Sequence, residues 1–238
     1  MCGGRHGGRR AGLIRLYKIC KRYESGRVAL RDVTLHVAPG ELVLLTGPTG
    51  SGKSTLLRIL FGDERPTSGR GIVNGRNLDR LEGASLAALR RELGLVFQDP
   101  RLIERWSVLD NVALAAEVGG LGHGVAVSRA RTLIEMIGLA DYLDAPPSVL
   151  SAGERQKIAI VRSLINQPAL LLADEPTGNL DPDASAEIVD LLREINRDGT
   201  TVVIATHDQD ALDLLRCRTL MMYDGRLVEE EERIAADL

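Results

Sequence analysis

Long apolar runs are missing from this chain of 238 residues. The longest, such as Val112 to Ala116 and Ala169 to Ala173, have five residues, whereas a membrane-spanning helix needs about 20. Residues 1–12 are rich in Gly and Arg and contain no apolar stretch, so they do not form a secretory signal. We therefore expect no intrinsic membrane span, and a flexible basic arm over residues 1–12.

Cysteine is scarce as well. Cys2, Cys20 and Cys217 are far apart, and none has the spacing of a CxxC or Cys/His ligand set. An odd, scattered set indicates neither a disulfide framework nor a zinc site. The simplest interpretation is a reducing, cytoplasmic compartment.

Positive charge is not in excess. The 30 basic and 33 acidic side chains give a formal net charge of −3, whereas nucleic-acid binding normally requires a broad positive field. Nucleic acid is therefore not an expected partner. The acids that cluster over residues 229–238 indicate a solvated acidic C-terminal tail.

The apolar pattern predicts an alternation of strands and helices. The length of the chain, 238 residues, fits one large domain or a domain with an inserted subdomain. Because strands and helices alternate, the strands are expected to form a parallel sheet. Helical periodicity from about residue 100 to 166 predicts a helical subdomain. The expected strands are 13–19, 28–37, 42–46, 71–74, 93–97, 169–173 and 201–205, and the expected flanking helices are 54–61 and 182–198.

One loop has the sequence of a phosphate-binding motif. It runs Gly47-Pro48-Thr49-Gly50-Ser51-Gly52-Lys53-Ser54, follows a predicted strand and opens a helix at Ser54 and Thr55. Its glycines let backbone N–H groups face phosphates, and the helix N-terminus adds positive potential. Lys53 can reach the β- and γ-phosphates, and Ser54 can ligate Mg²⁺. The loop therefore predicts a site for a nucleoside triphosphate with Mg²⁺.

Two further predicted strands end in polar residues. Asp174 and Glu175 follow one, and His207 follows the other. Taken alone, the acids could be a strand meeting solvent and the histidine could be structural. Because ligands of open α/β sheets collect beyond the carboxyl ends of the strands, one site could use all three ends. Asp174 would then hold Mg²⁺, and Glu175 would orient or deprotonate the attacking water.

A fourth motif brings a resemblance to a known family. Leu150-Ser151-Ala152-Gly153-Glu154 stands 23 residues ahead of Asp174, and the chain from about Leu13 to Val228 resembles the ATP-binding subunit of an ABC transporter. The resemblance implies an α/β fold of the P-loop NTPase class over residues 13–228, with a mixed β core, an antiparallel β subdomain and a helical subdomain. The same Ser-x-x-Glu pattern is also a capping box at a helix N-terminus, and the two interpretations are compatible.

The resemblance implies ATP and Mg²⁺ between two copies of the chain arranged head to tail, with Ser151 and Gly153 acting on the ATP of the opposite copy. For two of the residues that resemble family positions, a second interpretation stays open. Tyr23 could be a core or surface tyrosine, and Asp181 could be a plain helix N-cap before Pro182. Ala152 stands where the family usually has Gly, which would penalise a positive φ. The implied roles are phosphate binding by Gly47, Pro48, Thr49, Gly50, Ser51, Gly52, Lys53, Ser54 and Thr55, metal binding by Ser54, Gln98 and Asp174, other nucleotide contacts by Tyr23, Gln98, Ser151, Ala152, Gly153 and Asp181, and catalysis by Lys53, Glu175 and His207.

Within the family, the run from Asp174 to Asp181 is typical of a branch that includes lipoprotein-release ATPases, MacB-type exporters and the cell-division ATPases of the FtsE type. The runs 64–69, 96–99 and 108–112 resemble the cell-division type most, and a free-standing cassette fits it. This resemblance implies an FtsX-like integral membrane partner, a peripheral location on the inner face of the cell membrane, and control of peptidoglycan hydrolases during division. Family partners insert a coupling helix beside the helical subdomain, which we expect near Gln98 and Trp106, although Trp106 could be a core residue.

Three alternatives stay open from the sequence. The chain could serve a lipoprotein-release or small-molecule transporter, or it could be an ATP-dependent dimeric scaffold that recruits division proteins. A DNA-maintenance ATPase of the SMC or Rad50 type is disfavoured, because only 52 residues separate Gln98 from Ser151 and they contain no sustained heptads.

Overall fold

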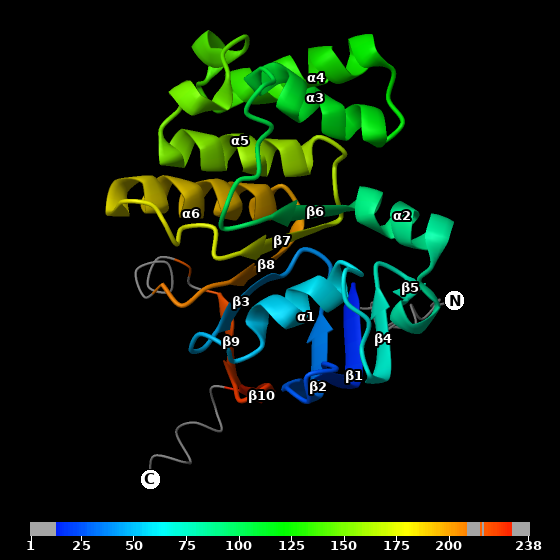
Figure 1. The fold of residues 1–238 in the computed structure, drawn as a ribbon. Coiled ribbons are helices and arrows are strands. Elements are labelled where there is room, and N and C mark those ends of the chain that lie inside the picture. The colour runs from blue at the N-terminus through cyan, green and yellow to red at the C-terminus, as the bar shows by residue number, and fades with distance from the viewer. Residues whose placement is uncertain (1–12, 209–214, 216, 230–238) are drawn as a thin grey trace, which may run out of the picture.

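The computed structural model describes residues 13–208, 215 and 217–229. The predicted arm over residues 1–12 and all but the first residue of the predicted acidic tail lie outside these residues. Within the described part of the chain, no helix is long and apolar enough to cross a membrane. Figure 1 shows an antiparallel sheet, a central sheet and a group of helices.

The antiparallel sheet contains β1 (Ile14–Arg22), β2 (Val28–Val37), β4 (Ser68–Val73) and β5 (Arg76–Asn77), in the order β2-β1-β4-β5. Along β1, Ile14 and Leu16 are buried while Arg15 and Tyr17 are exposed. This alternation is that of a sheet with one face on the core. The sheet confirms the prediction of an antiparallel β region in the N-terminal part of the domain.

The central sheet has the order β10-β9-β3-β8-β7-β6. Its neighbouring strands are parallel except for the antiparallel pair β9 and β10. Leu170 to Ala173 of β7 and Val202 to Ala205 of β8 are apolar and buried, because helices cover both faces of the sheet. The strands are β3 (Leu42–Thr46), β6 (Leu93–Val96), β7 (Leu170–Asp174), β8 (Thr201–Ala205), β9 (Arg218–Tyr223) and β10 (Arg226–Glu229).

Two of these strands, β9 and β10, are not predicted from the sequence. Strand β9 contains the apolar run Leu220 to Tyr223, but only Leu220 and Met222 are buried in it. Its pairing with β3 from Val43 to Thr46 is a tertiary contact between segments far apart in the chain. The structure therefore extends the predicted parallel sheet by an edge ribbon.

Helices cover both faces of the central sheet. Helix α1 (Lys53–Leu60) lies between the two sheets, and α6 (Pro182–Arg197) lies on the opposite face (Figure 1). Ile188 and Leu192 of α6 share a buried cluster with β7 and β8. Helix α2 (Gly83–Glu92) is not predicted from the sequence, and Leu89 is its only buried residue. The described chain also has three short 3-10 turns, η1 (Leu78–Arg80), η2 (Ala140–Tyr142) and η3 (Pro147–Val149).

The helices α3 (Val108–Val118), α4 (His123–Met136) and α5 (Ala152–Leu164) form a group with a core of its own. Val112, Ala130 and Ile158 are among the buried residues of this cluster. Helix α5 also supplies Ile160 to the core shared by α6 and the central sheet, and Figure 1 shows it between α6 and the other two helices. The helical pattern predicted from about residue 100 begins in the structure at Val108.

The loop that enters α3 is held by Asn111, which is 1% exposed. Its Oδ1 accepts a hydrogen bond from the Ile103 N–H at 2.7 Å, and its Nδ2 donates to the Ile103 and Ser107 carbonyls at 3.1 and 2.9 Å. One side chain thus fixes a loop that has no regular structure of its own.

We expect Asn111→Ala to lower the free energy of unfolding by about 2–4 kcal/mol, because it leaves buried backbone groups without partners. Urea denaturation followed by circular dichroism measures this loss. The neighbouring control Asp110→Asn, on an exposed side chain, should cost no more than about 1 kcal/mol. Equal effects of the two changes would contradict the role given to Asn111.

Candidate nucleotide site

The phosphate-binding loop joins β3 to α1. Gly47, Gly50 and Gly52 have φ of +133°, +81° and +115°, in the left-handed region that favours glycine. A Cβ on Gly47 would lie 2.0 Å from the Met222 carbonyl oxygen. The loop is therefore packed so closely against β9 that only glycine fits at position 47. Helix α1 begins directly after the loop, so its N-terminal N–H groups lie at the end of the loop.

Lys53, the first residue of α1, is 6% exposed. Its Nζ donates to the carbonyl oxygens of Gly47 and Pro48 at 2.6 and 3.3 Å. It also lies 3.8 Å from Oε1 of Glu175. The ammonium group thus stands over the loop, between the loop and the acid after β7.

Ser54 and Asp174 meet although 120 residues separate them. The Ser54 hydroxyl donates to Oδ1 of Asp174 at 3.0 Å. Burial raises the pKa of the Asp174 carboxyl above its ordinary value of 3.8, the Ser54 hydrogen bond opposes this, and the charge of Glu175 adds to it.

This pair fits a magnesium ion that arrives with phosphates. A hydroxyl and a carboxylate are oxygen ligands of the kind Mg²⁺ takes, and Mg²⁺ in nucleotide sites is held by one or two carboxylates plus phosphate oxygens and water. Among the described residues there is no group of three or more His, Cys, Asp and Glu that could hold a metal ion. Beyond Ser54, Asp174 and the predicted ligand Gln98, the remaining ligands would come from the nucleotide and from water.

Glu175 and His207 join the ends of β7 and β8. The Glu175 N–H donates to the Ala205 carbonyl at 2.7 Å. In return the His207 N–H donates to Oε2 of Glu175 at 3.2 Å, and His207 Nδ1 lies 2.8 Å from Oε1. Glu175 has a positive φ of 49°, and these bonds hold it in that conformation. The structure thus brings together the strand ends that the sequence predicts at one site.

Lys53, Ser54, Glu175 and His207 line one cavity of about 570 Å³. Asp174 lines a neighbouring cavity that shares Ser54 and Gln98 with it. Tyr23 is half-buried at the edge of the first cavity, with its hydroxyl 3.4 Å from the Thr55 hydroxyl, so it is not a core tyrosine. Three lining residues are not predicted from the sequence, Ser25, Arg27 and Arg58. They belong to no motif, and nothing in their sequence neighbourhood marks them. The predicted residues that line the cavity are Tyr23, Thr49, Gly50, Gly52, Lys53, Ser54, Thr55, Gln98, Glu175 and His207.

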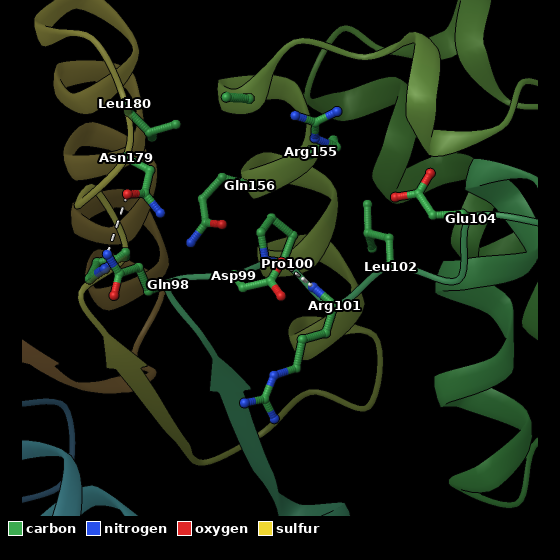
Figure 2. A pocket seen from close by; sticks show the side chains of 12 residues that line it. Gln98, Asp99, Pro100, Arg101, Leu102, Glu104, Arg155, Gln156, Asn179 and Leu180 are labelled. Carbon is green, nitrogen blue, oxygen red and sulfur yellow. Dashed lines mark hydrogen bonds between the residues drawn. The ribbon is translucent and has the colours of Figure 1, made fainter.

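Gln98 reaches the cavity from the loop after β6. Figure 2 shows its side chain turned toward Asn179, with its Nε2 3.5 Å from the Asn179 Oδ1. Helix α5 fixes the same loop through two side chains. Gln156 donates to the Phe97 carbonyl at 3.1 Å. The Arg162 guanidinium donates to the Pro100 and Arg101 carbonyls at 2.6 and 2.8 Å. The loop that carries Gln98 is therefore held by α5, while Gln98 itself lines the cavity of the phosphate loop.

The residues expected to act on a second copy lie elsewhere. Ser151, Gly153 and Asp181 do not line the cavity of their own chain. Ser151 forms the predicted capping box, accepting from the Glu154 N–H at 3.2 Å and donating its own N–H to the Glu154 carboxylate at 2.8 Å. Asp181 caps α6 by accepting from the Ala184 N–H at 2.9 Å.

Ala152 requires a correction. It is the first residue of α5, and its φ is not positive. The expected backbone penalty of Ala in place of Gly is therefore wrong, because a residue at the start of a right-handed helix has the φ that alanine favours.

Comparison with known proteins assigns this arrangement to a family. The model of the family described as "ABC transporter" matches residues 30–178, which contain the phosphate loop, the signature and the acid pair. The chain belongs to the ABC transporter family. Among relatives, it is 45% identical to "Cell division ATP-binding protein FtsE" of Mycobacterium tuberculosis, over 93% of this chain and 96% of that protein. It is 42% identical to the protein of that name from Escherichia coli K12, over 90% and 97%.

A solved structure agrees with the ABC fold. "Dimeric structure of a post-hydrolysis state of the ATP-binding cassette MJ0796 bound to ADP and Pi" matches with a TM-score of 0.81 and 34% identity, over 90% of this chain and 96% of that one.

The buried carboxyl of Asp174 leads to a stability prediction. Folding raises the pKa of Asp174 above 3.8. Between pH 3.8 and the raised pKa, the native state therefore binds more protons than the unfolded state. The free energy of unfolding falls as the pH rises through this range. Asp174→Asn keeps an acceptor for Ser54 and removes the buried charge. We expect it to raise the melting temperature at pH 7 without nucleotide, with a difference from wild type that narrows as the pH is lowered.

Differential scanning calorimetry between pH 4 and 8 measures this difference. The control Asp141→Asn, on an exposed carboxyl, should stay within about 2 °C of wild type throughout. A lower melting temperature for Asp174→Asn than for wild type at pH 7 would show that the Asp174 charge does not destabilise the folded state.

Proposed function

We propose that this chain is the ATP-binding and ATP-hydrolysing subunit of an FtsE/FtsX-like membrane complex that acts in bacterial cell division. The observation that carries the ATPase is the joining of Lys53, Glu175 and His207 within one cavity, beside the Ser54 and Asp174 pair. The full-length similarity to FtsE proteins supports the cell-division role.

Each residue has a role that follows from its position. The N–H groups of the loop and of α1 bind the phosphates, with the Lys53 ammonium among them. Ser54, Asp174 and Gln98 would hold Mg²⁺, which when bound neutralises charge that develops on the phosphates. Glu175 orients the attacking water and accepts its proton, and His207 fixes the Glu175 carboxylate through two contacts. Tyr23 stacks on the adenine.

The proposed active form is a head-to-tail homodimer that closes on ATP. Ser151 and Gly153 stand at the N-terminus of α5, which is a site for anions, and they lie outside the cavity of their own chain. A second copy would bring these residues and Asp181 against the nucleotide. Dimers of a related cassette support this arrangement. In this proposal residues 13–228 form one ABC domain, with a helical subdomain over about 100–166.

An apolar groove of about 540 Å³ is the proposed docking site for the membrane partner. It is lined by Leu86 and Ala87 of α2 and by Leu114 and Val118 of α3, and Val118 is 65% exposed. Exposed apolar patches mark interaction sites. Trp106 is half-buried in a hollow of about 290 Å³ that shares Leu114 with this groove, whereas Gln98 lines neither. Docking there would hold the chain on the inner face of the membrane.

We expect Glu175→Gln to reduce phosphate release by at least about 100-fold, because general base catalysis contributes roughly 10² to 10⁴. ATP binding should persist, since the amide keeps the shape of the side chain. Phosphate release and equilibrium ATP binding of the purified complex measure the two effects. A variant that hydrolyses ATP at the wild-type rate would remove Glu175 from the proposed mechanism.

We expect the double change Ala87→Glu and Val118→Glu to prevent capture of an FtsX-like protein when tagged chain is purified from native membranes in mild detergent. Carboxylates in the groove would have to be desolvated on docking. Val149→Glu is the matched control, because Val149 is 56% exposed on η3 and lies outside the groove. Trp106→Ala tests the neighbouring hollow in the same assay.

Each outcome of that purification is informative. Recovery of a lipoprotein-release or transport permease by the wild-type chain would replace the cell-division role while keeping the ATPase. Equal recovery of the partner by the groove variant and its control would contradict the docking site.

A further inference from the structure

Arg27 lines the nucleotide cavity, yet it belongs to no motif and has no role in the mechanism above. A tight turn between β1 and β2 fixes its backbone. The Gly26 N–H donates to the Tyr23 carbonyl, and the Tyr23 N–H donates to the Arg27 carbonyl, both at 2.9 Å. Gly26 has a φ of +84°, as such a turn requires. Arg27 therefore stands directly across the turn from Tyr23.

The side chain of Arg27 reaches over the phosphate loop. Its Nη2 lies 3.9 Å from the point that a Cβ on Gly50 would occupy. Gly50 is in the middle of the loop, whereas the Tyr23 hydroxyl lies at Thr55, on the first turn of α1. The two residues of this turn thus face different parts of the loop.

Within residues 13–208, 215 and 217–229, the guanidinium of Arg27 has no hydrogen-bond or ion-pair partner. Two nearby arginines, by contrast, lie beside acids: Arg31 is 3.5 Å from an Asp224 carboxylate oxygen, and Arg65 is 3.0 Å from Glu82. Lys53, the other cation over the loop, is already engaged with two loop carbonyls. Arg27 therefore offers five unused N–H donors at the cavity.

We infer that Arg27 binds the phosphate tail of the nucleotide above the Gly50 turn. The inference rests on the proposed function, that this cavity takes ATP. A guanidinium is a planar donor that matches phosphate oxygens two at a time, and its bonds to a charged acceptor are stronger than those to a neutral one. The tail would lie between the loop N–H groups with Lys53 on one side and Arg27 on the other.

The test measures binding of a fluorescent, non-hydrolysable ATP analogue with Mg²⁺, and its displacement by magnesium tripolyphosphate, which has the phosphate tail and no base or ribose. We expect Arg27→Ala to weaken both ligands by about 10-fold, the effect of losing one or more charged hydrogen bonds. Arg27→Lys should recover part of the loss, because the charge remains without the fork. Arg70→Ala is the matched control, since Arg70 is exposed on β4 and lies outside the cavity.

The results separate the inference from the proposal beneath it. If Arg27→Ala binds both ligands as Arg70→Ala does, Arg27 has no contact with the nucleotide. If it weakens only the nucleotide analogue, the contact is to base or ribose and the inference is wrong. If the wild-type chain binds neither ligand, the proposed function fails as well. Arg27→Ala should melt within about 2 °C of wild type, because the side chain makes no recorded contact that would stabilise the fold.

Discussion

The register of three neighbouring parallel strands is the constraint on which this site depends. Ala205 of β8 pairs with Leu45 of β3 on one side and with Asp174 of β7 on the other. The three strands therefore end at the same height, and whatever follows each of them arrives at one edge of the sheet. The phosphate loop lies 120 residues from Asp174, and His207 lies a further 32 residues after Glu175. The hydrogen-bonded register places all three within a few ångströms of one another.

The fold accepts charges at this edge that it would otherwise exclude. Lys53 is nearly fully buried, and burial raises the pKa of Asp174. The apolar core does not stabilise the charge of Lys53 or of Asp174. Each of the two side chains therefore needs polar partners that limit the cost of its desolvation. Lys53 uses loop carbonyls, Asp174 uses Ser54, and Glu175 uses His207. A polyphosphate with a divalent cation would complete the set, which is why the arrangement fits a binding site better than a structural ion-pair network.

The loop after β6 connects this edge to the helical group. Its carbonyls are held by Gln156 and Arg162 of α5, and its far end is held by Asn111 of α3. Gln98, at its start, faces the phosphate loop. A shift of α5 relative to the central sheet would therefore move Gln98. The groove proposed for the partner is lined by α2 and α3 and also by Asn111 and Arg162. A partner docked there would contact side chains that hold this loop.

The amino-acid sequence by itself determined the local parts. Continuous apolar runs identify β3, β7 and β8 because strands covered on both faces bury every residue. The glycine spacing of the phosphate loop and the Ser151 and Glu154 capping box are visible because their geometry depends on residues close in the chain. Only the tertiary structure decided the rest. Strand β9 pairs with distant β3, and β10 pairs with β9. Helix α2 buries a single leucine, and Ala152 does not have the positive φ that would penalise alanine. Arg27 joins the site because a two-strand turn folds over a loop that is some twenty residues away in the chain, and no local pattern encodes that approach.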